Sequence, residues 1–252
     1  MTNLLEINNL SVDFPSRRGQ VAAVNEVSIT VAKGEVLGLV GESGAGKSTV
    51  GNSVINLLEP PGYISGGEII FDGSRIDQLS NEEMRKIRGA KIGTIFQDPQ
   101  TSLNPLMTIG KQLSETLIET LKISGSSARE KSIELLDSVG IPNPEPRLDA
   151  YPHQFSGGMR QRVVIALALA GDPDLIIADE PTTALDVSIQ KQILDLIKSL
   201  CKQRNLGVII VTHDIGVIAE IADRVAVMYN GQLVEEGEVK QVLQKPKHEY
   251  TK

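Results

Sequence analysis

The chain has 252 residues, of which 40% are hydrophobic and 23% charged, which is ordinary for a globular protein and enough for one large domain. The net charge of −7 argues against a nucleic-acid-binding surface, and the single cysteine, Cys201, excludes a disulfide framework or a thiol metal site. No secretory segment opens the chain, and no apolar run approaches the roughly 18–20 residues that span a bilayer.

The N-terminal segment predicts two half-exposed strands, over residues 4–14 and 27–31, because apolar and polar residues alternate there. Such alternation favours an antiparallel sheet with one solvent-facing side. A loop is expected from Pro15 to Gly19, with Phe14 at its mouth. Phe14 can stack on an adenine ring or serve as a core residue at the end of a strand, and the pattern alone favours the core.

Residues 36–49 carry the strongest motif in the chain. An unbroken apolar run leads into Gly41-Glu42-Ser43-Gly44-Ala45-Gly46-Lys47-Ser48-Thr49, and apolar residues at helical spacing follow. Strand, glycine-rich turn and helix form the context in which G-x-x-x-x-G-K-[ST] is a phosphate-binding P-loop. Backbone N–H groups and a helix N-terminus attract the phosphates, Lys47 neutralises them, and the Ser48 hydroxyl holds Mg²⁺. The expected nucleotide-binding residues are Gly41, Ser43, Gly44, Ala45, Gly46, Lys47, Ser48 and Thr49.

The middle of the chain changes from strand to helix patterns. Residues 68–71 followed by Asp72-Gly73 predict a hairpin, and residues 92–97 predict a buried strand that ends on Gln97. Apolar residues then recur at helical spacing over 107–122 and 127–139, with Gly140 as a helix stop. These patterns predict a small helical subdomain inserted into an α/β core.

The last third alternates strands and helices. A strand over 175–178 leads into Asp179-Glu180, a helix is marked by apolar residues over 189–200, and a strand over 207–211 leads into Thr212-His213. Two final strands, 225–228 and 232–234, flank Asn230-Gly231, which is a strong hairpin signal.

Four apolar runs therefore end at Gly41, Gln97, Asp179 and His213. Parallel strands of an α/β sheet place ligands at their carboxyl ends, so we expect these residues to converge on one crevice. Asp179 is expected to hold Mg²⁺ through water, and Glu180 to act as the base that orients and polarises the attacking water. Gln97 can reach both the metal and that water, and His213 can hydrogen-bond the γ-phosphate.

A second anion site is predicted at Ser156, which precedes an apolar helix as a natural N-cap. A γ-phosphate bound to a P-loop keeps one open side, so two molecules facing head to tail would each cap the other's nucleotide. The alternative is an ordinary capped helix.

Taken together, these motifs make the chain resemble the ATP-binding subunit of an ABC transporter along essentially its whole length. The family's signature L-S-G-G-Q corresponds to Phe155-Ser156-Gly157-Gly158-Met159, which departs at its first and last positions. The resemblance implies that Ser156, Gly157 and Gly158 contact a nucleotide across a dimer. It also implies that Phe14 is the aromatic platform for the adenine ring, that Gln97 is the glutamine of the family's glutamine loop, and that His213 is its switch histidine. Ala184-Leu185-Asp186 would be the family's dimer loop.

The fold implied by the resemblance is an α/β P-loop NTPase of the ABC cassette type. It has a mostly parallel core sheet, an N-terminal antiparallel β subdomain and an inserted helical subdomain. The core and the antiparallel subdomain would take residues 1–97 and 163–252 of a single ATPase domain. The helical subdomain, with the signature motif, would take about 98–162.

Finer patterns resemble the dipeptide, oligopeptide and nickel importer branch of this family: Phe96-Gln97-Asp98-Pro99, Ser102-Leu103-Asn104-Pro105 and Tyr151-Pro152-His153. The branch implies hydrolysis of ATP with Mg²⁺ at the cytoplasmic face of the cell membrane. The implied partners are permease subunits, a second ATP-binding subunit in a homo- or heterodimer, and indirectly an extracytoplasmic solute-binding protein, with no nucleic acid. In that branch a stretch similar to His248-Glu249-Tyr250-Thr251 leads into a further C-terminal extension, so we expect a longer natural protein.

Three other functions fit the sequence less well. Non-transport ABC ATPases of DNA repair or translation carry long coiled-coil insertions or a second cassette, and residues 98–152 are too short for either. A module that senses ATP without hydrolysis is disfavoured by the intact Glu180 and His213. A GTPase is disfavoured because the sequence lacks the N-K-x-D motif. The transported substrate does not follow from the sequence.

Overall fold

The computed structural model describes residues 3–16, 19–183 and 185–252. The chain forms two compact units, which are described separately below. Unit 1 comprises Met1–Met84 and Leu200–Lys252, and unit 2 comprises Arg85–Ser199. Helices α2 (Asn81–Ile87) and α8 (Val187–Arg204) run across the two boundaries.

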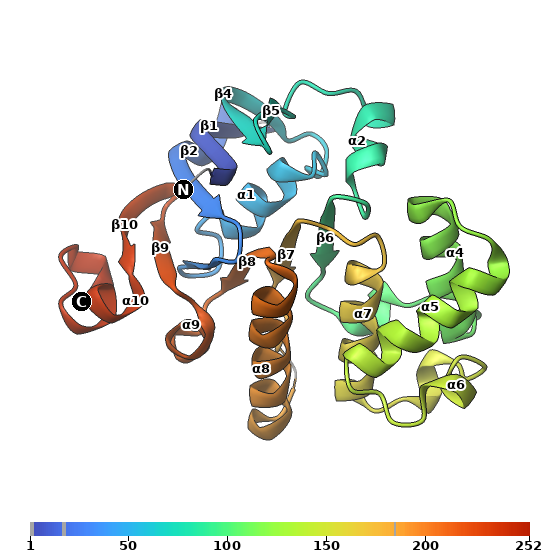
Figure 1. Ribbon diagram of the computed structural model, residues 1–252. Helices are drawn as coiled ribbons and strands as arrows, with labels where there is room; N and C mark the ends of the chain where they lie inside the picture. The colour runs from blue at the N-terminus through green and yellow to red at the C-terminus, as the bar shows by residue number, and fades with distance from the viewer. Residues whose placement is uncertain (1–2, 17–18, 184) are drawn as a thin grey trace. The chain divides into compact units, whose positions relative to one another are not determined.

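Unit 1 begins with an antiparallel sheet in the order β2-β1-β4-β5 (Figure 1). Its strands are β1 (Asn3–Ser16), β2 (Gly19–Ala32), β4 (Tyr63–Phe71) and β5 (Ser74–Arg75). The predicted hairpin at Asp72-Gly73 is confirmed, since both residues have the positive φ angles, 47° and 75°, that such a tight turn requires. The expected strands over 4–14 and 27–31 are present but longer.

The prediction of a loop from Pro15 to Gly19 is wrong at both ends of that segment. Pro15 pairs with Gln20, and Ser16 pairs with Gly19, so the β1–β2 ladder continues to the tip of the hairpin. Arg17 and Arg18 lie outside the described residues. Backbone pairing across a hairpin overrides the local turn preference of proline and serine.

The second sheet of unit 1 is mixed, with strands in the order β10-β9-β3-β8. These strands are β3 (Val36–Val40), β8 (Gly207–Thr212), β9 (Arg224–Tyr229) and β10 (Gln232–Glu238). Strand β3 pairs in parallel with both β8 and β9, and every residue of β3 and β8 is buried, as expected for central parallel strands. Strand β10 pairs with β9 in antiparallel fashion through Asn230-Gly231, which confirms the predicted hairpin.

The helices of unit 1 are short. They are α1 (Lys47–Val54), α9 (Ile215–Ile221), α10 (Val239–Gln244) and a 3-10 turn, η2 (Glu249–Thr251). Helix α1 is the helix predicted behind the P-loop. Asp214 caps the N-terminus of α9, and its carboxylate accepts the N–H groups of Gly216 and Val217.

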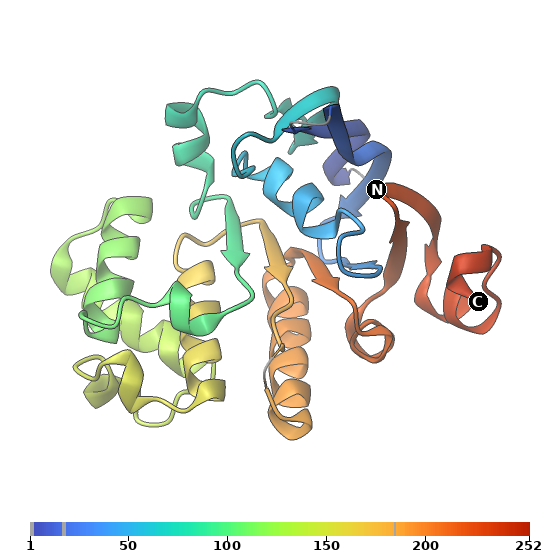
Figure 2. The same ribbon diagram turned by 180° about the vertical axis from the view of Figure 1, so that it is seen from behind.

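Unit 2 combines two parallel strands, β6 (Ile92–Ile95) and β7 (Leu175–Asp179), with a cluster of helices (Figure 1, Figure 2). The helices are α3 (Pro99–Ser102), α4 (Ile109–Leu121), α5 (Gly125–Ser138), α6 (Pro144–Arg147), η1 (Pro152–Gln154) and α7 (Gly157–Leu169). Helices α4 and α5 confirm the two predicted helices, with Gly140 just past the second. Thr108 and Ser124 cap their N-termini through side-chain oxygens.

Cys201 lies buried near the end of α8. Burial raises the pKa of its thiol to about 11, so the group is protonated and unreactive at neutral pH. Over residues 3–16, 19–183 and 185–252, no cluster of three or more His, Cys, Asp and Glu side chains is placed to hold a metal ion. In the same ranges, no helix has the length and hydrophobicity to cross a membrane.

Candidate functional site

The P-loop connects β3 to α1 in unit 1, as the motif predicts. Gly44 and Gly46 have φ angles of 82° and 95°, which side-chain-bearing residues rarely adopt. Gly41 and Gly46 also pass close to neighbouring backbone: a Cβ atom would lie 2.2 Å from the Met228 carbonyl oxygen at Gly41, and 2.4 Å from the Ala23 carbonyl oxygen at Gly46. The glycines of the motif are therefore required by this path of the loop.

Lys47 is the first residue of α1, and the residue is only 6% exposed. Its ammonium group donates hydrogen bonds of 2.8 Å to the carbonyl oxygens of Gly41 and of Glu42. The N-cap residue of α1 is Gly46, which makes no side-chain cap, and the positive end of the helix dipole adds to the charge of Lys47. Ser48 is exposed beside it, so this end of the helix is suited to bind an anion.

His213 lies next to the P-loop within unit 1. Val40 and Thr212 are partners in the parallel β3–β8 ladder, so Gly41 and His213 leave neighbouring strands at the same level. His213 is exposed. The predicted meeting of these two strand ends is confirmed.

Phe14 lies near the end of β1 and is half-buried. One edge of its ring packs against Gly62, where a Cβ atom would approach the ring to 2.5 Å. A ring held against backbone on one side is suited both to fill the end of the strand and to stack on a base.

Unit 2 brings together the other two strand ends. Ile95 of β6 pairs with Ala178 of β7, and Asp179 ends β7. The side-chain amide of Gln97 donates a hydrogen bond of 2.8 Å to the carboxylate of Glu180. Gly41 and His213 belong to unit 1, and Gln97 and Asp179 to unit 2, so the convergence of all four on one crevice stays a prediction.

Glu180 is held in an unusual way. Its φ angle is 46°, a left-handed conformation that is uncommon for residues other than glycine and that clusters at functional sites. The same carboxylate oxygen that accepts from Gln97 also accepts from the Thr183 hydroxyl, at 2.9 Å. Thr183 is not among the residues predicted from the sequence. It is the third residue after Glu180, so a local hydrogen bond from its hydroxyl to that carboxylate was the signal that could have identified it.

The signature residues start α7 in unit 2. The Ser156 hydroxyl accepts the N–H of Met159 at 3.3 Å, which confirms the predicted N-cap. Ser156 and Gly157 are exposed, whereas Phe155 is 3% exposed and packs in the core. The departure from leucine at this position therefore replaces one buried apolar residue with another.

Asp186 is exposed, and its carboxylate accepts the N–H of Ile189 in the first turn of α8. It thus caps a helix, and its place in the dimer loop stays a prediction. Ala184 of the same expected loop lies outside the described residues.

Comparison with known proteins assigns these motifs to one family. The family model described as "ABC transporter" matches residues 24–183. The oligopeptide transport ATP-binding protein OppD of Bacillus subtilis is 53% identical over 252 residues, covering 100% of this chain and 70% of OppD. The dipeptide transport ATP-binding protein DppD of the same organism is 51% identical over 253 residues, covering 100% of this chain and 76% of DppD.

Solved structures give the same result for the fold. The dimeric structure of the ATP-binding cassette MJ0796, in a post-hydrolysis state with ADP and Pi, has a TM-score of 0.81 and 31% identity. That likeness covers 93% of this chain and 98% of MJ0796. CbiO1 of Clostridium perfringens, part of the complex cbiONQ, has a TM-score of 0.84 at 29% identity, covering 97% and 92% of the two chains. These likenesses confirm the predicted α/β fold class.

Proposed function

Because the chain belongs to the ABC transporter family and is an ATP-binding protein of that family, we propose that its ATP hydrolysis drives the import of peptides through separate membrane subunits. The observation that carries the proposal is the arrangement around Glu180, whose carboxylate accepts hydrogen bonds from both Gln97 and Thr183. A protein that only sensed ATP would not need a carboxylate held in this way. The likeness to peptide transport proteins along the whole chain supports the substrate class, with nickel as the related alternative.

The P-loop residues are proposed to bind the phosphates of ATP. Lys47 would exchange its bonds with the loop carbonyls for bonds with phosphate oxygens, which keeps its buried charge paired. The residues that bind with it are Gly41, Ser43, Gly44, Ala45, Gly46, Ser48 and Thr49. Phe14 is proposed to stack on the adenine ring.

Mg²⁺ is proposed to be held by the Ser48 hydroxyl, by the Gln97 side-chain oxygen and, through water, by the Asp179 carboxylate. These donors fit the ion, because Mg²⁺ prefers oxygen ligands, keeps several waters and takes few protein ligands beside the phosphates. When bound, the ion neutralises charge on the phosphate oxygens.

Glu180 is proposed to be the general base that accepts a proton from the attacking water, and His213 to hydrogen-bond the γ-phosphate. Gln97 both orients Glu180 and holds the water. A base is effective only when it points at the proton that it removes. The strained backbone at Glu180 is therefore explained as the conformation that orients its carboxylate.

The active state is proposed to be a head-to-tail pair with a second ATP-binding subunit, identical or different. In this pair Ser156, Gly157, Gly158 and Asp186 of each subunit would meet the nucleotide on the other. The exposure of Ser156 and Gly157 supports this, since residues that act on a partner's ligand must be accessible.

We further propose that permease subunits hold the pair at the cytoplasmic face of the cell membrane, and that an extracytoplasmic solute-binding protein delivers the substrate. No role for nucleic acid is proposed, in keeping with the net charge of −7.

The proposed domain division follows the family's fold. The core takes residues 1–97 and 163–252, and the helical subdomain takes about 98–162.

The test is uptake into proteoliposomes that contain this subunit and its cognate membrane subunits and solute-binding protein. ATP-dependent uptake of a labelled oligopeptide is expected, and it should cease when the subunit carries Glu180→Gln. Parallel vesicles are given labelled Ni²⁺. Uptake of nickel without peptide would overturn the substrate class, and peptide uptake that persists with Glu180→Gln would overturn the coupling to hydrolysis.

A further inference from the structure

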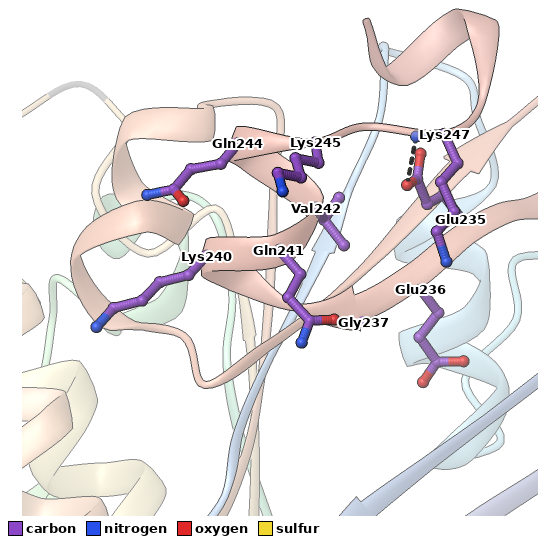
Figure 3. Close-up of a pocket in the computed structure, with 9 residues that line it drawn as sticks. All are labelled: Glu235, Glu236, Gly237, Lys240, Gln241, Val242, Gln244, Lys245 and Lys247. Carbon is purple, nitrogen blue, oxygen red and sulfur yellow. Dashed lines mark hydrogen bonds between the residues drawn. The ribbon is translucent and has the colours of Figure 1, made fainter.

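The segment Lys247–Thr251, here called the C-terminal brace, is fastened to β10 of unit 1. The carboxylate of Glu235 accepts the backbone N–H groups of Lys247 at 2.8 Å and of His248 at 3.0 Å, and Figure 3 shows the first of these bonds. Burial raises the pKa of the Glu235 carboxyl, but the backbone hydrogen bonds from Lys247 and His248, together with the Thr251 side chain and the positive charge of Lys247, lower it below its usual value. The brace is therefore held by a charged acceptor at neutral pH.

From this anchor the brace reaches the P-loop. The backbone N–H of Tyr250 donates to Nδ1 of His248 at 3.2 Å, which fixes the turn before the tyrosine. The Tyr250 hydroxyl then accepts the backbone N–H of Glu42 at 2.9 Å, across 208 positions of sequence.

The ring of Tyr250 is also held. It packs on the ring of Tyr229, with 4.4 Å between centroids and 33° between planes. Tyr229 follows Met228, whose carbonyl oxygen is the atom nearest to the position that a Cβ at Gly41 would take. Two contacts therefore place Tyr250 at the entry of the P-loop.

The peptide unit between Gly41 and Glu42 is consequently held at both ends. Its carbonyl oxygen accepts from the Lys47 ammonium at 2.8 Å, and its N–H donates to Tyr250. A rotation of this peptide plane would break both hydrogen bonds. The orientation of the plane sets the direction in which the loop leaves β3, and therefore where the following N–H groups point.

We propose that Tyr250 is a positioning residue for nucleotide binding, which fixes the Gly41–Glu42 peptide so that the P-loop is ordered before the phosphates arrive. This inference rests on the proposed role of the P-loop as the ATP site. A loop that is already ordered loses less conformational entropy on binding, so Tyr250 is expected to increase the affinity for nucleotide. Because the Gly41–Glu42 peptide lies at the start of the loop, ATP and ADP are affected alike, and the rate at saturating ATP is not.

The test compares Tyr250→Phe with Tyr229→Phe in the 252-residue chain. The first variant keeps the ring and removes the acceptor of the Glu42 N–H. The second removes a hydroxyl from the same ring pair and leaves that hydrogen bond in place. Both variants are measured in four ways: the dissociation constants of fluorescent ATP and ADP analogues, kcat at saturating ATP, amide hydrogen exchange at Glu42, and the unfolding midpoint without nucleotide.

Tyr250→Phe is expected to raise both dissociation constants about two- to tenfold, the range that follows from losing one neutral hydrogen bond. It should also speed exchange at Glu42, with kcat unchanged and an unfolding midpoint like that of Tyr229→Phe. Wild-type affinity in Tyr250→Phe would overturn the inference, as would equal weakening in both variants. A wild-type chain that binds neither nucleotide would instead refute the proposed function.

Discussion

Replacing Glu180 with glutamine is expected to preserve ATP binding while slowing hydrolysis about 10²–10⁴-fold, the usual contribution of a general base. The amide cannot accept the proton of the attacking water. It keeps one oxygen, however, and that oxygen can still accept from Gln97 and Thr183, which now share a single carboxylate oxygen. The geometry should therefore survive, and only the proton acceptor is lost.

The measurement is phosphate release at saturating ATP, beside nucleotide affinity. Because the variant binds ATP without turnover, it is also expected to accumulate an ATP-bound dimer in gel filtration with Mg²⁺. Glu145→Gln, an exposed glutamate of α6, is the matched control and should hydrolyse ATP at the wild-type rate. Turnover in Glu180→Gln at the rate of this control would remove Glu180 from the role of base.

Replacing Lys47 with alanine is expected to weaken ATP binding by about 30-fold or more, since truncating one partner of a buried, hydrogen-bonded charge pair costs about 2–5 kcal/mol. Lys47 as a residue is only 6% exposed, so water screens its charge little. The triphosphate would lose its main counter-charge within the loop. Equilibrium titration with a fluorescent ATP analogue measures the change.

Lys33→Ala is the control for this prediction, because Lys33 is an exposed lysine of the same unit in a long surface pair with Asp72. It should bind ATP as the wild type does. The unfolding midpoint of Lys47→Ala is recorded as well, because the carbonyl oxygens of Gly41 and Glu42 lose a donor. Affinity for ATP that equals the wild-type value in a folded Lys47→Ala protein would refute the P-loop assignment.

Features that depend on a few neighbouring residues were predictable from the sequence. The turns at Asp72-Gly73 and Asn230-Gly231 depend on residues that tolerate positive φ, and the N-cap at Ser156 depends on one hydroxyl next to a helix. The P-loop was predictable for the same reason, because the glycines, Lys47 and Ser48 form one continuous stretch.

Features that depend on distant partners were not predictable in this way. The hydrogen bond between Tyr250 and Glu42 joins residues 208 positions apart, and no local sequence pattern predicts it. The ends of β1 and β2 extend through Pro15 and Ser16 because each strand supplies the other's hydrogen bonds. The left-handed backbone of Glu180 likewise becomes visible only in the folded chain.

The most direct measurement of the central claim, that each ATP site is shared by two cassettes, is the hydrolysis rate of a mixture of two variants. Lys47→Ala and Ser156→Arg should each be inactive alone, because one lacks the phosphate-binding charge and the other blocks the signature that acts on the partner. In an equimolar mixture, half of the pairs contain both variants, and each of these has one intact site, so about a quarter of the wild-type rate is expected. A mixture no more active than its two separate components would contradict the account, since it would place Lys47 and Ser156 in the same chain's site.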